Sequence, residues 1–152
     1  MYRKFYLWTL VILSTALIFA SCSKTGVINN NNGPQTLEGT WAIRSITSDR
    51  PYDWNGDGRG ETDIYSTYTN CQRDIVIVFQ NNGYGQMRQG CNAQWENITY
   101  QLYNNNRQLM ISLPNDELNL SLSQFDNYTI RGTDPVYIEG NNYAVTYTFQ
   151  RR

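Results

Sequence analysis

Residues 117–125 read ELNLSLSQF, a stretch in which leucine and polar side chains alternate from Leu118 to Leu122. Successive side chains of a β-strand point to opposite faces of a sheet, so this alternation predicts a strand with one buried face. Residues 143–150 read YAVTYTFQ and repeat the pattern, with tyrosine, valine and phenylalanine on one face. Both stretches favour β-structure, and the chain contains no amphipathic helical pattern of useful length.

Short turn segments separate the predicted strands. Asn81-Asn82-Gly83 is one, because asparagine and glycine adopt the positive φ of a hairpin turn at little cost. Longer loops are expected over residues 48–70, with a helical turn at 65–70, and through Pro135. Eight strands are expected, at residues 39–47, 74–80, 84–89, 95–103, 108–113, 117–125, 128–131 and 143–150. Such a meander hides its edges best by closing, so the predicted fold class is all-β, an up-and-down antiparallel β-barrel of about eight strands.

The N-terminus has the pattern of an export signal. A short basic start precedes an apolar run over residues 5–19, which is shorter than the roughly 20 residues of a comfortable transmembrane helix. The following small residues lead directly to Cys22, and this order resembles the lipobox of bacterial lipoproteins. We therefore expect residues 1–21 to be a lipoprotein signal peptide and Cys22 to carry lipid. The alternatives are an ordinary signal peptide cut near Ala20 and an uncleaved anchor.

Residues 22–36 are expected to form a flexible tether between the lipid and a single domain at residues 37–152. The tether contains Asn29-Asn30-Asn31-Asn32-Gly33-Pro34, which has no apolar period and cannot form a core. No acidic cluster follows Cys22 directly. We therefore expect a protein held to the membrane by the lipid on Cys22, in the bacterial cell envelope, as an outer-membrane lipoprotein facing the periplasm.

Composition excludes several classes of function. The chain carries 12 lysine and arginine residues against 13 aspartate and glutamate residues, with no basic stripe, so we expect no nucleic-acid partner. It contains no histidine, which is the commonest general base and the commonest zinc ligand. A Ser-His-Asp or Cys-His catalytic arrangement cannot be built, and we do not expect an enzyme.

The three cysteines divide into one lipid site and one pair. If Cys22 takes lipid, Cys71 and Cys91 remain, and an exported protein meets an oxidising compartment in which a disulfide is the default. The midpoint between them falls in the Asn81-Asn82-Gly83 turn, so the two cysteines flank one hairpin and lie nearly opposite each other. Two free buried thiols are the alternative.

The loop after the first strand contains a motif for calcium. It reads DWNGDGRGETD over residues 53–63, which resembles the opening of an EF-hand-type loop with its turn glycine at Gly58. Ile64 stands where that motif has a bidentate glutamate. We expect a possible structural Ca²⁺ held by Asp53, Asn55, Asp57, the carbonyl of Arg59, Glu61 and, in place of the missing glutamate, Asp63. The alternative is a solvated turn held by side chain–backbone hydrogen bonds.

Gly39-Thr40-Trp41 on the first strand resembles the Gly-x-Trp signature of lipocalins. The wider order resembles small lipocalin-like lipoproteins of Gram-negative bacteria, from Leu37 to Arg152: a lipobox, Leu-x-Gly-x-Trp, Asp-x-Asn-x-Asp-Gly, Cys-x-x-Asp and a C-terminal arginine. The resemblance implies a barrel of about eight strands and little about activity. It also implies a late arginine over Trp41, for which Arg151 is the candidate. A frayed Arg151 in solvent is the alternative.

Two functions remain open at this stage. The first is a binding module for a small apolar ligand or an envelope partner, and the second is a structural or accessory lipoprotein of an envelope complex with a filled barrel. A connected cavity of about 300 Å³ or more would favour the first. The aromatic residues that could line a cavity, or could simply fill the core, are Trp41, Trp95, Tyr100, Tyr128, Tyr143 and Tyr147.

Overall fold

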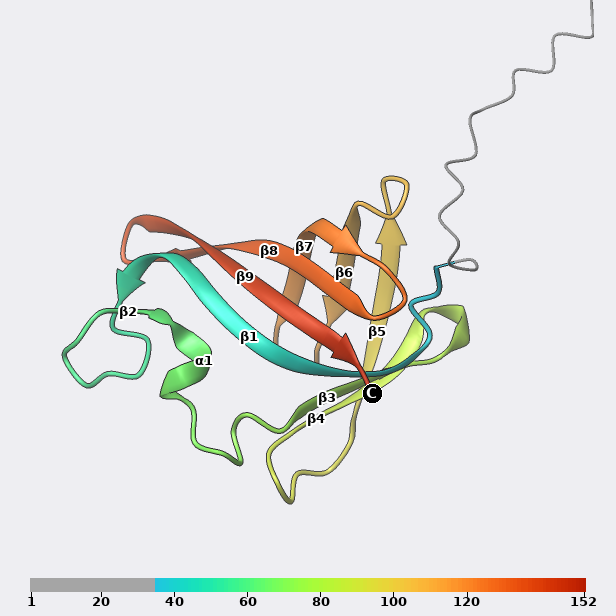
Figure 1. The fold of residues 1–152 in the computed structure, drawn as a ribbon, viewed down its shortest axis with the longest axis horizontal. Coiled ribbons are helices and arrows are strands. Elements are labelled where there is room, and N and C mark those ends of the chain that lie inside the picture. Colours follow the sequence, from blue (N-terminus) through green and yellow to red (C-terminus); the bar gives the residue numbers. More distant parts are fainter. Residues whose placement is uncertain (1–34) are drawn as a thin grey trace, which may run out of the picture. The chain divides into compact units, whose positions relative to one another are not determined.

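Strand β1 (Gly39–Tyr52) closes the barrel of residues 35–152, the part of the chain that the computed structural model describes (Figure 1). The other elements are β2 (Glu61–Asp63), α1 (Ile64–Thr67), β3 (Ile75–Phe79), the 3₁₀ turn η1 (Asn81–Gly83), β4 (Tyr84–Gln89), β5 (Glu96–Tyr103), β6 (Gln108–Ser112), β7 (Glu117–Phe125), β8 (Thr129–Ile138) and β9 (Asn141–Arg151). Strands β3 to β9 pair in sequence order, and β1 pairs with both β3 and β9. All of these pairings are antiparallel. The predicted fold class, a closed up-and-down barrel, is confirmed.

Strand β1 changes its neighbours along its length. Residues 39–42 pair with β3, residues 41–48 pair with β9, and the end of the strand pairs with β2. A shift in register lies between Ile43 and Ser45, where the extra residue bends the strand and increases its twist. Pairing with β2 also explains why β1 continues to Tyr52, beyond the predicted strand at residues 39–47.

Strand β8 is longer than the sequence predicted. A strand at residues 128–131 and a loop through Pro135 were expected, but β8 runs from Thr129 to Ile138 and pairs with β9 over that whole length. A tight turn joins the two strands, and both its residues, Glu139 and Gly140, have positive φ, as two-residue hairpin turns require. The loop prediction was therefore wrong, and the β8–β9 hairpin is long (Figure 1).

Pro135 is tolerated because its nitrogen faces no strand. It stands opposite Ala144 of β9, whose amide donates to Asp49 of β1 at 2.8 Å. The Ala144 amide thus points away from β8, so Pro135 and Ala144 form a non-hydrogen-bonded pair of the antiparallel ladder. In such a pair the Pro135 nitrogen points away from β9, toward the side of β7. Pairing between β7 and β8 has ended at Thr133, so no ladder hydrogen bond is lost.

Aliphatic side chains fill the middle of the barrel. Leu109, Ile111, Leu120 and Ile130 are fully buried, and Phe149 is the aromatic residue that joins them. The inward face of β7 and β9 agrees with the predicted alternation. Complete burial of such a side chain contributes roughly 1.5–3 kcal/mol relative to exposure. Isoleucine, leucine and valine make up most of the buried core residues, and the aromatic residues Trp41, Phe79, Tyr143 and Phe149 fill the rest, so the interpretation that aromatic residues fill the core holds in part.

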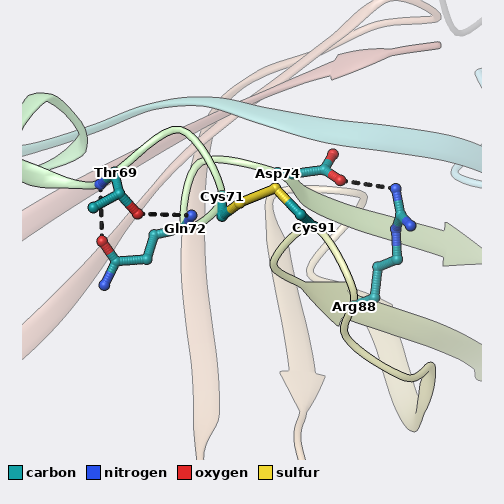
Figure 2. The surroundings of a disulfide bond; sticks show 6 residues. All are labelled: Thr69, Cys71, Gln72, Asp74, Arg88 and Cys91. Atoms are coloured by element: carbon teal, nitrogen blue, oxygen red, sulfur yellow. Dashed lines mark hydrogen bonds and ion pairs between the residues drawn. A yellow bond between two sulfur atoms is a disulfide. The ribbon is translucent and has the colours of Figure 1, made fainter.

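Cys71 and Cys91 form the predicted disulfide. Their Cα atoms are 4.8 Å apart, and the bond joins the loop before β3 to the loop after β4 (Figure 2). Asp74, just before β3, and Arg88, near the end of β4, form an ion pair of 2.8 Å close to the disulfide. The disulfide therefore extends the β3–β4 hairpin and holds the loop that carries α1.

Residues 1–34 lie outside the described part of the chain. The predictions of a signal peptide at residues 1–21, a lipid on Cys22 and most of the tether at residues 22–36 fall there. Among residues 35–152, no helix has the length and apolarity needed to span a bilayer.

Candidate functional site

The two ends of the barrel differ in how they are closed. At the end where β1 begins and β9 ends, Trp41 is fully buried and its Nε1 donates to the carbonyl of Leu37 at 2.8 Å. The guanidinium carbon of Arg151 lies 4.4 Å from the centre of the Trp41 ring. The predicted stacking of Arg151 on Trp41 is confirmed. We call this the sealed end.

Arg151 also satisfies its hydrogen-bond donors at the sealed end. Its Nε, Nη1 and Nη2 donate to the carbonyls of Asn127, Glu38 and Thr36, each at 2.6 Å. Gly39 has a φ of +126°, and a Cβ at that position would lie 2.4 Å from Nη1 of Arg151. The glycine is therefore needed both for its backbone conformation and for the space that the guanidinium occupies.

A cavity of about 410 Å³ opens at the opposite end of the barrel. It forms because β7 and β8 pair only through residues 121–125 and 130–133, while residues 134–138 of β8 continue alone with β9. The space between the two strands is bounded by the β6–β7 turn and by the loop around α1. Its walls include three carboxylate residues and four aromatic residues, namely Asp116, Glu117, Asp134, Trp54, Tyr68, Tyr137 and Tyr147. We call it the mouth cavity.

Asp134 is the buried acid of the mouth cavity. It lies on the inward face of β8 and is only 9% exposed. Burial raises the pKa of its carboxyl group, the backbone amide of Asn119 opposes that rise, and the negative charges of Asp116 and Glu117 add to it. Among residues 35–152, no arginine or lysine forms an ion pair with Asp134. The carboxylate is therefore held in a partly desolvated site without a counter-ion from the described chain.

Two neighbouring aromatic residues share this environment. Burial raises the pKa of the Tyr147 hydroxyl, and the charge of Asp134 adds to the rise. Trp54 packs edge-on against Tyr52 and Tyr143, with ring centres 5.2 and 5.6 Å apart. Its Nε1 is buried and has no hydrogen-bond partner among the described residues. Tyr147 and Trp54 thus present aromatic surface at the cavity.

The loop that carries Trp54 and Tyr68 is held firmly to the barrel. Tyr65 of α1 donates its hydroxyl to the carbonyl of Ile43 on β1 at 3.1 Å. Arg73 donates from Nε to the carbonyl of Tyr65 at 3.0 Å, and Cys71 anchors the same segment to Cys91. The walls of the mouth cavity that come from this loop are therefore positioned by hydrogen bonds and a covalent link.

The structure separates the six aromatic residues that were candidates for a cavity wall. Tyr147 lines the mouth cavity, Trp41 lies at the sealed end, and Tyr143 is buried against Trp54. The remaining three lie elsewhere: Tyr100 packs edge-on against Phe79 and donates its hydroxyl to the carbonyl of Gln80, while Trp95 is 45% and Tyr128 70% exposed. These residues do not line one common cavity. Trp95 precedes β5 and Tyr128 lies in the β7–β8 turn, so strand alternation does not direct either of them inward.

Of the charged and aromatic residues that line the mouth cavity, only Tyr147 was singled out from the sequence. Asp134 was missed because Pro135 indicated a loop, although Ile130, Gly132 and Asp134 follow the alternation of a strand. Trp54 and Tyr68 lie in the loop between β1 and β3, where no periodicity indicates which side chains face the barrel. The alternation on β8 was the only available signal.

The loop at residues 53–63 is organised by hydrogen bonds to its own backbone. Asp53 accepts from the amides of Asp57 at 2.9 Å and Gly58 at 2.8 Å. Asp57 in turn accepts from the amide of Arg59 at 2.9 Å. These are the bonds of the alternative interpretation, a turn held by side chain–backbone contacts.

Asn55 belongs to the same turn, because its Oδ1 accepts from the Asp57 amide at 3.0 Å. Asp63 instead caps α1 by accepting from the Ser66 amide at 3.1 Å, and Glu61 begins β2. Within residues 35–152, no three His, Cys, Asp or Glu side chains are grouped so that they could hold a metal ion. Calcium binding by this loop stays a prediction.

Comparison of the chain with protein-family models, with curated proteins and with solved structures gave no match in any of the three. The resemblance to lipocalin-like lipoproteins therefore stays a prediction, and the barrel rests on the structure itself.

Proposed function

We propose that this protein is a lipid-anchored binding module of a bacterial cell envelope, with its ligand site in the mouth cavity. The carrying observation is the cavity of about 410 Å³, which exceeds the roughly 300 Å³ at which ligand pockets begin. Because aliphatic side chains fill the middle of the barrel, the ligand would lie at the mouth and not along the barrel axis. The wall is part carboxylate and part aromatic, so the ligand would carry polar groups as well as apolar surface.

The accessory role in an envelope complex is the second candidate, because the same filled interior also supports it. Exposed tyrosines occur on the outside of the barrel, with Tyr84 62% and Tyr128 70% exposed. Tyrosine is enriched at protein–protein contacts because its ring and hydroxyl suit a partly polar interface. The two candidates differ in what should remain bound to the purified protein.

Native mass spectrometry of the protein purified from its own envelope tests the ligand site. We expect a small molecule to be retained, and Val136→Trp, which places a large ring in the mouth cavity, should release it. Arg131→Trp is the matched control, since Arg131 is exposed on the outward face of the same strand. Retention of a protein partner alone, unaffected by Val136→Trp, would favour the accessory role and contradict the ligand site.

The proposed anchor is tested separately at Cys22. The basic, apolar and small-residue order before Cys22 supports lipidation. Cys22→Ser should leave an unprocessed precursor or a soluble form, seen by membrane fractionation and intact mass. A variant that stays with the membrane and has the lipidated mature mass of the wild type would contradict the anchor.

A further inference from the structure

The mouth cavity has an unbalanced charge. Asp116, Glu117 and Asp134 contribute carboxylates to its wall, and no arginine or lysine of residues 35–152 lines it. Arg50 does not line the cavity: its guanidinium carbon lies 4.8 Å from the centre of the Tyr143 ring, and its Nε lies 3.9 Å from a carboxylate oxygen of Asp49. A ligand that enters the cavity therefore meets negative charge that the described chain does not neutralise.

The burial of the Asp134 carboxylate determines which kind of ligand the cavity favours. Asp134 is 9% exposed, and a buried carboxylate is costly unless a cation or several hydrogen-bond donors accompany it. No arginine or lysine of residues 35–152 forms an ion pair with it, and the backbone amide of Asn119 opposes the rise in its pKa. A positively charged ligand group would supply the missing counter-ion, whereas an anionic ligand would add repulsion from all three carboxylates.

The aromatic wall indicates an organic cation over a bare metal ion. Trp54, Tyr68 and Tyr147 line the same cavity, and the faces of such rings attract ammonium groups. Among the described residues, no three carboxylates are grouped closely enough to hold a metal ion. The cavity volume of about 410 Å³ also suits a small organic molecule better than a single ion.

We propose that the mouth cavity binds a small amine or quaternary ammonium compound, with Asp134 as its counter-ion and Trp54 and Tyr147 as its aromatic contacts. This inference rests on the proposed function, since it names the class of ligand for that same cavity. It differs from the apolar ligand expected from the sequence, because the buried carboxylate was not visible there.

The test compares two probes of almost identical shape. Choline carries a trimethylammonium group and a hydroxyl, and 3,3-dimethyl-1-butanol is its neutral carbon isostere. Binding to the full lipidated protein in a non-ionic detergent is measured by ligand-observed NMR and calorimetry. We expect choline to bind at least tenfold more tightly than the neutral isostere.

Two variants then locate the binding. Asp134→Asn keeps the size of the side chain and should reduce the preference for choline to within about twofold, and Trp54→Leu should weaken choline binding as a second, independent variant. Asp126→Asn is the control at the sealed end, where Asp126 accepts from the amides of Tyr128 and Thr129, and it should leave binding unchanged. Circular dichroism verifies that each variant is folded.

The outcomes separate this inference from the proposed function. Equal binding of both probes, or a preference that survives Asp134→Asn in the folded variant, overturns the inference and leaves a neutral-ligand site in place. Binding of neither probe also overturns it, and the retained ligand in native mass spectrometry then decides the proposed function alone. A retained native ligand that is anionic would contradict the inference directly.

Discussion

The sealed end and the mouth cavity use the same kinds of side chain in opposite ways. At the sealed end the cation Arg151 lies on Trp41, and three backbone carbonyls accept its hydrogen bonds. At the mouth the anion Asp134 lies beside Tyr147 and Trp54, and no cation of the described chain accompanies it. One end therefore satisfies its charge within residues 35–152, while the carboxylate at the other end has no ion-pair partner among those residues.

This contrast separates stability from function within one barrel. A partly buried charge with its partners in place ties separate segments together, as Arg151 does for those around Glu38 and Asn127. A buried charge that lacks a partner lowers the stability of the free protein, and such groups concentrate at functional sites. Changes at the sealed end should therefore reduce the free energy of unfolding, whereas changes at the mouth should alter binding and pH dependence.

The largest expected effect is that of Trp41→Ala. Removing a fully buried tryptophan should reduce the free energy of unfolding by about 3–5 kcal/mol, measured by urea denaturation. Tyr147→Ala at the mouth should cost less, because Tyr147 is only partly buried. Tyr84→Ala, on an exposed side chain, should change stability by no more than about 0.5 kcal/mol. Equal losses at Trp41 and Tyr147 would break the proposed contrast between the ends.

The disulfide gives the next largest effect and reports on the mouth. Replacing Cys71 and Cys91 together by alanine opens a link across a sequence separation of 20 residues, which should cost roughly 3 kcal/mol. Hydrogen exchange should rise most in the loop of residues 53–74, because the bond holds the segment that carries Trp54 and Tyr68. Uniform loosening of both ends would contradict the view that the disulfide serves the mouth.

The sequence predicted the barrel because the signal for it is local. Alternation on β7 and β9 is visible within nine or ten residues, and the disulfide follows from a spacing centred on a turn. The stacking of Arg151 on Trp41 came from a resemblance, not from alternation alone. The alternation depends on neighbours along the chain, and the pairing of the two cysteines depends on the register of the hairpin between them.

The mouth cavity could not be predicted because it depends on where strands separate. Pairing between β7 and β8 ends at Thr133, a fact set by the twist of two whole strands. Pro135 then indicated a loop, and only the three-dimensional pairing shows that its nitrogen faces no partner. Trp54 and Tyr68 reach the cavity from a loop without periodicity, so their inward position is a tertiary outcome.

Arg151→Lys sharpens the comparison at the sealed end. Lysine keeps the charge but loses the planar group that stacks on Trp41 and donates to three carbonyls, so we expect a loss of about 1–2 kcal/mol. Arg152→Lys is the matched control, because Arg152 makes a more exposed ion pair with Asp74 at 3.3 Å and should lose under about 1 kcal/mol. Equal effects of the two substitutions would mean that the stacked geometry contributes nothing.

The pH dependence of stability tests the unpaired charge at the mouth. The pKa of Asp134 is raised in the folded protein, so the folded state binds its proton more tightly than the unfolded state. Below the ordinary pKa of 3.8 both states are protonated, and as the pH rises through the raised folded pKa this group's contribution to stability falls. Asp134→Asn removes that fall, so the melting temperature of the wild type relative to the variant should decrease between pH 3 and pH 7. A constant difference across that range would contradict the burial of an ionisable carboxyl group.

The smallest expected effect concerns calcium at residues 53–63, where the loop is already complete as a hydrogen-bonded turn. Asp53 and Asp57 accept from backbone amides and keep further lone pairs for a cation, but Ile64 supplies no bidentate carboxylate, so binding should be weak, about 10⁻⁴–10⁻³ M as in extracellular modules. With free calcium equal to the dissociation constant, the gain in stability is only about 0.4 kcal/mol. Thermal melting in millimolar calcium and in chelator measures this gain.

Asp57→Asn distinguishes a calcium site from a turn, because an asparagine oxygen can still accept from the Arg59 amide while the negative charge is lost. If calcium binds, the wild type should melt at a higher temperature in calcium than in chelator, and Asp57→Asn should melt equally in both. Asp57→Ala removes the acceptor as well, so it should melt lower than Asp57→Asn even in chelator. Identical curves for the wild type in calcium and chelator, with no heat of binding, would show that the loop is a turn alone.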